Sequence, residues 1–200
     1  MELFRRASGA PSRLAVFPGA FHPPTRAHLG LARAALSRVD QVLLVLPRAF
    51  PHKEFAEVSF DARLELLSAA TAREPRWSLG SSDGGLFVEI ARECRALYGP
   101  GPELLLLCGR DAAERIMEWD YGPAGASIAE MLTGFRLLVA DRGGGYDPPA
   151  GLRRFVERLE IPTDLQQISA TEVRARIRRG EAWRHLVPEE IAARVGELYG

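Results

Sequence analysis

The residues most suggestive of chemistry follow a short apolar run at residues 13–17 and read Pro-Gly-Ala-Phe-His-Pro-Pro-Thr-Arg-Ala-His over residues 18–28. Gly19 has no side chain, so its backbone can approach a ligand closely. Thr25 is a suitable N-cap, which would place His28 on the same side of the first helical turn. Free amides at a helix start bind phosphate, and an imidazolium there can donate to a phosphoryl oxygen. An ordinary surface histidine would also fit this segment.

A second helix start lies near the other end of the chain, where residues 168–174 read Ile-Ser-Ala-Thr-Glu-Val-Arg. Ser169 and Glu172 have the spacing of a capping box, which is a purely structural role. Thr171 and Arg174 are three residues apart and share the same first turn. A hydroxyl, free amides and a guanidinium can therefore converge on one anion, and the planar arginine fork suits bidentate phosphate binding.

Two further segments follow apolar runs and carry polar side chains. Lys53 is the only lysine among the 26 basic residues; it could reach a polyphosphate as a mobile charge, and chance survival is an equal alternative. Gly109 permits close approach, and Asp111 could accept hydrogen bonds from ribose hydroxyls. Trp119 could stack on an aromatic base or be an ordinary core residue.

The composition excludes several classes of function. Acidic and basic residues balance at 26 each, which argues against coating of DNA or RNA. No apolar run reaches the roughly 18–20 residues needed to span a bilayer. Cys94 and Cys108 are expected to be buried free thiols, and no cluster has metal-ligand spacing. We expect a cytoplasmic protein whose partners are small-molecule nucleotides, not nucleic acids or membranes; a homo-oligomer is compatible with the sequence.

Strands alternating with helices must position these residues. Apolar runs predict strands at residues 13–17, 41–46, 77–81, 104–108, 135–140 and 165–168. Periodicity predicts helices at residues 25–39, 60–67, 88–98, 112–119, 152–159, 170–179 and 191–198. Continuous apolar strands indicate a parallel sheet covered on both faces, with ligands at the carboxyl ends of its strands. The length favours one domain over residues 1–200, with a helical part from about residue 169.

Residues 19–28 and 168–174 together resemble the nucleotidyltransferase superfamily that carries (His/Thr)-x-Gly-His and Ile-Ser-x-Thr-x-x-Arg motifs. Within it, the chain resembles the bacterial nicotinate-nucleotide adenylyltransferases in the order of Pro51-His52-Lys53, Arg63, Gly109-x-Asp111, Trp119 and the ending at residues 186–199. The resemblance implies a Rossmann-like, doubly wound α/β fold with a short helical C-terminal extension. It also implies AMP transfer from ATP to nicotinate or nicotinamide mononucleotide, with Mg²⁺ and release of pyrophosphate.

The resemblance also implies roles for individual residues. His28 would contact ATP phosphates and stabilise charge on the transferred group, with Thr25 and Lys53 beside it. The remaining ATP contacts would come from Gly19, Ala20, Phe21, Gly109, Asp111, Ile168, Ser169, Thr171 and Arg174. Acceptor contacts would come from Trp119, stacked on the pyridine ring, and from Lys53 and Phe87.

The sequence departs from the family pattern at three places. His22 stands where Asp or Asn is usual, Ala27 replaces the motif glycine, and residues 84–90 lack the usual threonine. Because residues 84–90 correspond to the family's acceptor side, another phosphorylated acceptor is the first alternative: a pantetheine phosphate, a flavin or a sugar-alcohol phosphate. The second alternative is a nucleotide-binding module without turnover.

Overall fold

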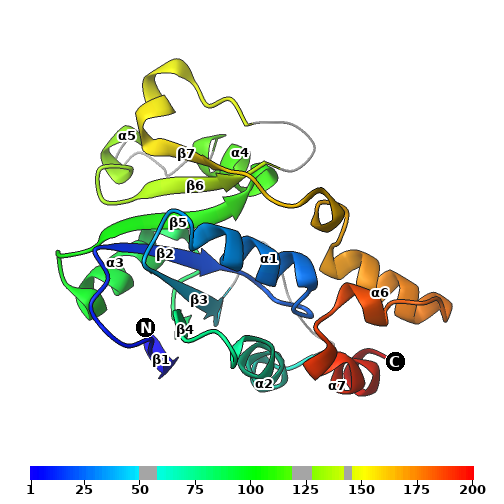
Figure 1. Cartoon of the computed structure of the whole chain (residues 1–200). Coiled ribbons are helices and arrows are strands. Elements are labelled where there is room, and N and C mark those ends of the chain that lie inside the picture. The colour runs from blue at the N-terminus through cyan, green and yellow to red at the C-terminus, as the bar shows by residue number, and fades with distance from the viewer. Residues whose placement is uncertain (50–57, 119–127, 142–145) are drawn as a thin grey trace.

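The computed structural model describes residues 1–49, 58–118, 128–141 and 146–200. Its centre is one twisted sheet with the strand order β1-β4-β3-β2-β5-β6-β7 (Figure 1). The strands are β1 (Glu2–Arg5), β2 (Arg13–Pro18), β3 (Gln41–Pro47), β4 (Trp77–Ser82), β5 (Glu103–Gly109), β6 (Arg136–Ala140) and β7 (Val156–Leu159). All neighbours are parallel except β1, which pairs antiparallel with β4.

Helices cover both faces of the sheet, so the doubly wound α/β fold is confirmed. The α-helices are α1 (Arg26–Ala35), α2 (Phe60–Thr71), α3 (Phe87–Tyr98), α4 (Arg110–Glu118), α5 (Ile128–Met131), α6 (Ala170–Arg179) and α7 (Glu189–Tyr199). Along β2, Ala15 and Phe17 face α1 and α2, whereas Leu14 and Val16 face α3 and α4. This alternation is why each strand is apolar along its whole length.

A third apolar cluster lies away from the sheet and joins α2, α6 and α7. Leu66 of α2, Val173 of α6 and Val195 of α7 are buried at its centre. Figure 1 shows α7 beside α2 and below α6, at the end of the sheet toward which the parallel strands point. In the described ranges, no helix has the length and apolarity to cross a bilayer.

Two expectations from the sequence are wrong and one strand was not predicted, because tertiary contacts overrode the local pattern. Residues 152–159 were expected to be helical, but a 3-10 helix, η1 (Ala150–Phe155), gives way to strand β7, which completes the sheet edge beside β6. Residues 165–168 are not a strand: η2 (Thr163–Leu165) and a turn occupy this stretch. The periodicity also gave no sign of β1, which pairs with β4 at the opposite edge.

Candidate active site

The strand order puts two of the predicted ligand-binding segments, residues 18–28 and 109–111, next to each other. β2 is hydrogen-bonded to β3 on one side and to β5 on the other, so the chain leaves β2 and β5 at adjacent points of one sheet edge. This is the topological switch point, where open α/β sheets bind ligands. Gly19 follows β2. Gly109 is the last residue of β5, and Asp111 lies in the first turn of α4.

Thr25 caps α1 as predicted, and His28 completes the cap. The Thr25 hydroxyl accepts from the His28 amide at 3.3 Å, and His28 Nδ1 accepts from the Thr25 amide at 3.0 Å. A backbone amide can only donate, so Nδ1 is the acceptor of this hydrogen bond, and Nε2 is the ring nitrogen left to donate to a ligand. The cap therefore presents His28 as an Nε2–H donor at the positive end of α1.

Two aromatic rings hold the imidazole from the side of the sheet. The Phe21 ring lies edge-on to the His28 ring, with their centroids 5.2 Å apart. The Phe21 ring also lies edge-on to the Phe17 ring, with their centroids 5.6 Å apart. Phe21 is 1% exposed and has a φ of 44°, a left-handed conformation that is strained for a bulky side chain. Burial of the ring offsets that strain, and the strained turn reverses the chain directly after β2.

Gly19 is required by packing inside the chain. A Cβ at position 19 would lie 2.9 Å from Cζ of Phe21, and the Gly19 amide already donates to the Val45 carbonyl at 3.0 Å. Its lack of a side chain therefore makes room for the Phe21 ring. Gly109 differs, since a Cβ there would meet no heavy atom of the described residues within 4 Å. The sequence assigned the same role to both glycines, and only Gly109 has open space for a ligand.

This contrast gives a paired prediction. Gly19→Ala is expected to destabilise the protein by about 1–3 kcal/mol, because the Phe21 ring is wedged between two others and cannot move aside freely. Gly109→Ala is expected to change stability by less than about 0.5 kcal/mol while raising the KM for ATP. Thermal unfolding of both variants and steady-state kinetics measure these effects; equal unfolding midpoints would contradict the packing role of Gly19.

Two arginines from distant helices hold carbonyl oxygens of the turn after β2. Arg63 of α2, which is 5% exposed, donates from Nη1 to the Ala20 carbonyl at 3.1 Å. Arg174 of α6 donates from Nη1 to the His22 carbonyl, and its Nη2 lies 3.5 Å from the Thr171 hydroxyl. Burial lowers the pKa of Arg63, although arginine stays charged at neutral pH. The two separated motifs thus meet through Arg174.

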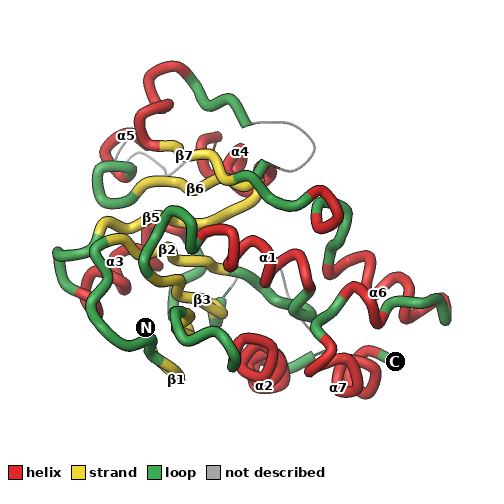
Figure 2. The backbone as a smooth tube through the Cα atoms, in the orientation of Figure 1, coloured by secondary structure: helices red, strands yellow, loops and turns green. Residues whose placement is uncertain are grey.

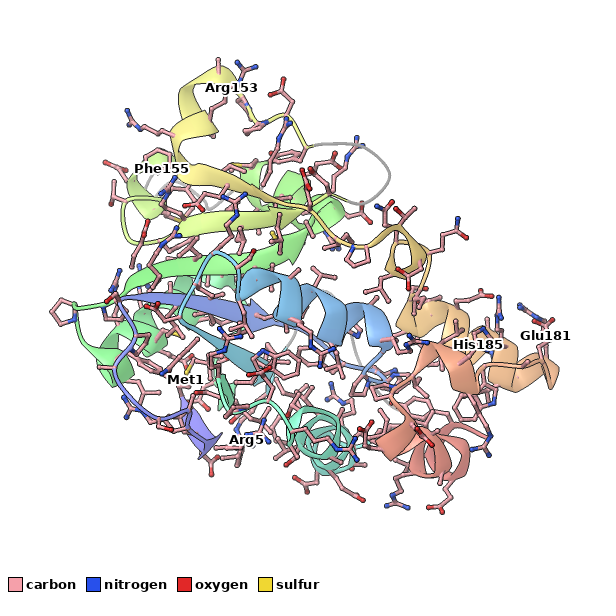
Figure 3. All side chains as sticks on the ribbon, viewed as in Figure 1. Met1, Arg5, Arg153, Phe155, Glu181 and His185 are labelled. Carbon is pink, nitrogen blue, oxygen red and sulfur yellow. The ribbon has the colours of Figure 1, made fainter. Side chains whose placement is uncertain are left out.

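The second motif is brought to α1 by close packing. A Cβ at Gly30 of α1 would lie 2.1 Å from Cδ1 of Leu165, so α1 and η2 approach each other where one of them lacks a side chain. The Arg26 side chain donates to the His185 carbonyl at 3.3 Å, and Figure 3 labels His185 on the side of the molecule where α1 begins. Figure 2 shows the loop after β7 passing this end of α1 before α6 starts.

At the start of α6 the Ser169 hydroxyl accepts from the Glu172 amide at 3.1 Å, which is one half of the predicted capping box. The Glu172 carboxylate pairs with Arg176 at 2.7 Å along the same helix. Ile168 packs against the third cluster and Thr171 is exposed. The helix start therefore combines an anchored cap with an exposed hydroxyl and the Arg174 guanidinium.

The residues expected on the acceptor side lie only partly within the described ranges. Phe87 begins α3 and packs partly buried against the cluster under that helix. The loop before it is held by carboxylates: Glu89 accepts from the Leu86 amide at 2.9 Å, and Glu93 accepts from the Gly84 amide at 3.1 Å. Lys53 and Trp119 lie outside the described residues.

Cys94 and Cys108 are free and buried, as expected. Burial raises the pKa of both thiols to about 12. Neither is a thiolate at neutral pH, so neither has the character of a nucleophile.

Four residues in and around the site are more deeply integrated into the fold than the sequence suggested. Arg63 was singled out only by the family resemblance. The feature of the sequence that could have identified it is its position, as a charged residue, on the apolar face of α2. His22 and Tyr199 have rings 5.0 Å apart in an edge-on arrangement. Ala27, which replaces the motif glycine, is buried with 2% exposure. The chain accommodates both departures from the motif in its core.

Comparison with known proteins agrees with this geometry. Residues 16–176 match the model of a family described as cytidylyltransferase-like. A probable nicotinate-nucleotide adenylyltransferase of Marinobacter nauticus is 32% identical, with 92% of this chain and 95% of the relative covered. One from Gloeobacter violaceus is 31% identical, with coverage of 90% and 92%.

Solved structures with the same fold include nicotinic acid mononucleotide adenylyltransferase from Plasmodium falciparum. The form complexed with NaAD has a TM-score of 0.72 at 14% identity, covering 94% of this chain and 98% of the other. The form complexed with APC has a TM-score of 0.70 at 15% identity, with coverage of 94% and 97%. These structural neighbours bind nucleotides.

Proposed function

Because the chain belongs to the cytidylyltransferase-like family, we propose that it transfers AMP from ATP to nicotinate mononucleotide and releases pyrophosphate. The observation that carries this proposal is the hydrogen bond from Arg174 to the His22 carbonyl, because it joins the two predicted phosphate-binding segments. The curated relatives, which are named for this reaction, match over nine-tenths of the chain. Nicotinamide mononucleotide is the alternative pyridine acceptor.

The chemistry needs little more than alignment and charge compensation. The acceptor phosphate is ionised at neutral pH and is itself the nucleophile, so no general base is required. Its oxygen attacks the α-phosphorus of ATP, the bond from that phosphorus to the bridging oxygen breaks, and pyrophosphate leaves with the electron pair. The His28 Nε2–H and the Arg174 guanidinium compensate the developing negative charge.

We assign the other site residues to supporting contacts. Thr25 sets the ring orientation of His28 through the cap. The triphosphate is bound by the helix start at Ile168, Ser169, Thr171 and Arg174, together with the turn at Gly19, Ala20 and Phe21. The adenosine ribose is bound at Gly109 and Asp111, and Phe87, Lys53 and Trp119 serve the acceptor side.

Mg²⁺ would enter this site with ATP. Across the described parts of the chain, no three His, Cys, Asp or Glu side chains gather in a group that could hold a metal ion. Mg²⁺ commonly keeps several waters and binds mainly through substrate phosphates. It would neutralise phosphate charge there, while His28 and Arg174 orient the phosphoryl groups.

An acceptor panel tests the proposal. Pyrophosphate release is measured with ATP and, in parallel, CTP, using nicotinate and nicotinamide mononucleotides, a pantetheine phosphate, a flavin phosphate and a sugar-alcohol phosphate. Release with ATP and a pyridine mononucleotide is the expected result. Release with another acceptor would reassign the substrate, and release with none would favour a binding module. A cytoplasmic location remains a prediction, and the sequence is compatible with a homo-oligomer.

Lys53 is expected to act mainly on ATP affinity. Lys53→Ala should raise the Kd for ATP by about tenfold or more, the scale of one hydrogen bond to a charged group. Lys53→Arg keeps the charge on a different geometry and should fall between the alanine variant and the wild type. Calorimetric titration with MgATP measures all three, and an unchanged Kd in Lys53→Ala would leave this lysine without a role.

A further inference from the structure

The turn after β2 is strained and must be held from outside. Phe21 keeps a φ of 44° while its ring is fully buried. Such a conformation is strained for a residue with a bulky side chain and persists only where the surroundings over-determine it. The Phe17 and His28 rings hold it from the sheet and from α1. The other contacts that hold the turn come from α2, α6 and α7, the helices that share the third apolar cluster.

Each of these three helices contributes one contact to the turn. α2 provides Arg63 on the Ala20 carbonyl, and α6 provides Arg174 on the His22 carbonyl. α7 provides Tyr199, whose ring meets the His22 ring edge-on at 5.0 Å and an interplanar angle of 69°. His22 is 6% exposed, so this ring pair is an interior contact.

Tyr199 also lies close to the arginine that holds the other end of the turn. Burial lowers the pKa of Arg63, and the nearby Tyr199 phenol opposes this shift. The Tyr199 hydroxyl oxygen is itself buried. In a trans peptide the carbonyl and the following amide point in opposite directions, so Arg63 on the Ala20 carbonyl fixes the direction of the Phe21 amide. Tyr199 thus touches one end of the turn and lies beside the anchor of the other.

We propose that Tyr199 is a positioning residue: through the His22 ring it holds the turn at residues 19–22 in the geometry that presents His28 and the backbone amides to ATP. His22 and Tyr199 then act as a pair, and His22 in place of the family's usual Asp or Asn becomes part of how this chain builds the site. The inference rests on the proposed nucleotidyl transfer. It assigns a role in that reaction to α7, far from β2 in the sequence.

Tyr199→Leu, Tyr199→Phe, His22→Ala and the double variant His22→Ala/Tyr199→Leu test the proposal. Tyr199→Leu removes the ring and is expected to lower kcat/KM by about tenfold, the scale of one lost aromatic pair. Tyr199→Phe keeps the ring and should recover most of the activity. The double variant should be no worse than the poorer single variant, because both changes remove one contact.

Val195→Ala is the matched control, since it lies on the same helix and opens a cavity in the third cluster. It should lower the unfolding temperature at least as much as Tyr199→Leu does. At assay temperatures below that unfolding midpoint, its kcat/KM should stay within about twofold of the wild-type value. Equal activity losses in Val195→Ala, or multiplicative losses in the double variant, would overturn the positioning role.

A second readout separates this proposal from the proposed function. The Kd for MgATP is measured by calorimetry on the same variants, without an acceptor. Weaker binding in Tyr199→Leu and His22→Ala, with recovery in Tyr199→Phe, supports the positioning role even where no pyridine mononucleotide is adenylated. Unchanged Kd and unchanged kcat/KM in Tyr199→Leu would reject it, whatever the acceptor.

Discussion

His28→Ala is expected to lower kcat by about 100-fold or more, the scale of losing one preorganised donor that stabilises developing charge. The Nδ1 atom of His28 is committed to the Thr25 amide, so the catalytic contribution comes from the Nε2–H side of the ring. The Phe21 ring, which lies edge-on to the imidazole, restricts the orientation of His28 before substrate arrives. Steady-state kinetics with ATP and the active acceptor measure the loss.

Two further variants separate the catalytic donor from the helix cap. His28→Asn retains an acceptor near the position of Nδ1 but places no N–H where Nε2 lies, so it should unfold near the wild-type midpoint with kcat as low as in His28→Ala. His28→Gln has a donor that reaches the Nε2 position and should recover part of kcat at some cost in stability. If His28→Asn turned over at the wild-type rate, His28 would have only a capping role.

Arg174→Ala is expected to lower kcat/KM by about 100-fold, because the variant loses a charged hydrogen bond to phosphate and a tie between the two motifs. Arg174 bridges the His22 carbonyl and the Thr171 side chain, so its fork is oriented before ATP binds. Arg174→Lys should recover little, since a single ammonium cannot reproduce two fixed N–H directions.

Arg178→Ala is the control for Arg174→Ala. Arg178 is an exposed arginine on the same helix, so its removal changes net charge and helix propensity by similar amounts. Its kcat/KM should stay within about twofold of the wild type. Comparable losses in the two variants would mean that α6 acts through its overall positive field and that Arg174 makes no specific contact.

Much of the fold was accessible from the sequence because its determinants are local. Five of the predicted strands, and the helices that follow them up to α4, lie within a few residues of their expected bounds. Continuous apolar runs and caps such as Thr25 and Ser169 specify these elements within about ten residues of chain. The elements that were mistaken, β7 and η2, sit at the sheet edge and against α1, where neighbours far away in the sequence decide the backbone.

The site shows the same division. The sequence by itself determined that Thr25 caps α1 with His28 in its first turn and that Ser169 caps α6, because each cap is a hydrogen bond across three residues. Only the tertiary structure decided that Arg174 reaches the His22 carbonyl, 152 residues away. That contact depends on the order of the strands, on the packing of Leu165 against Gly30, and on a helical core shared by α2, α6 and α7. Local pattern carries no information about such long-range packing, because its free energy arises only once the whole chain has folded.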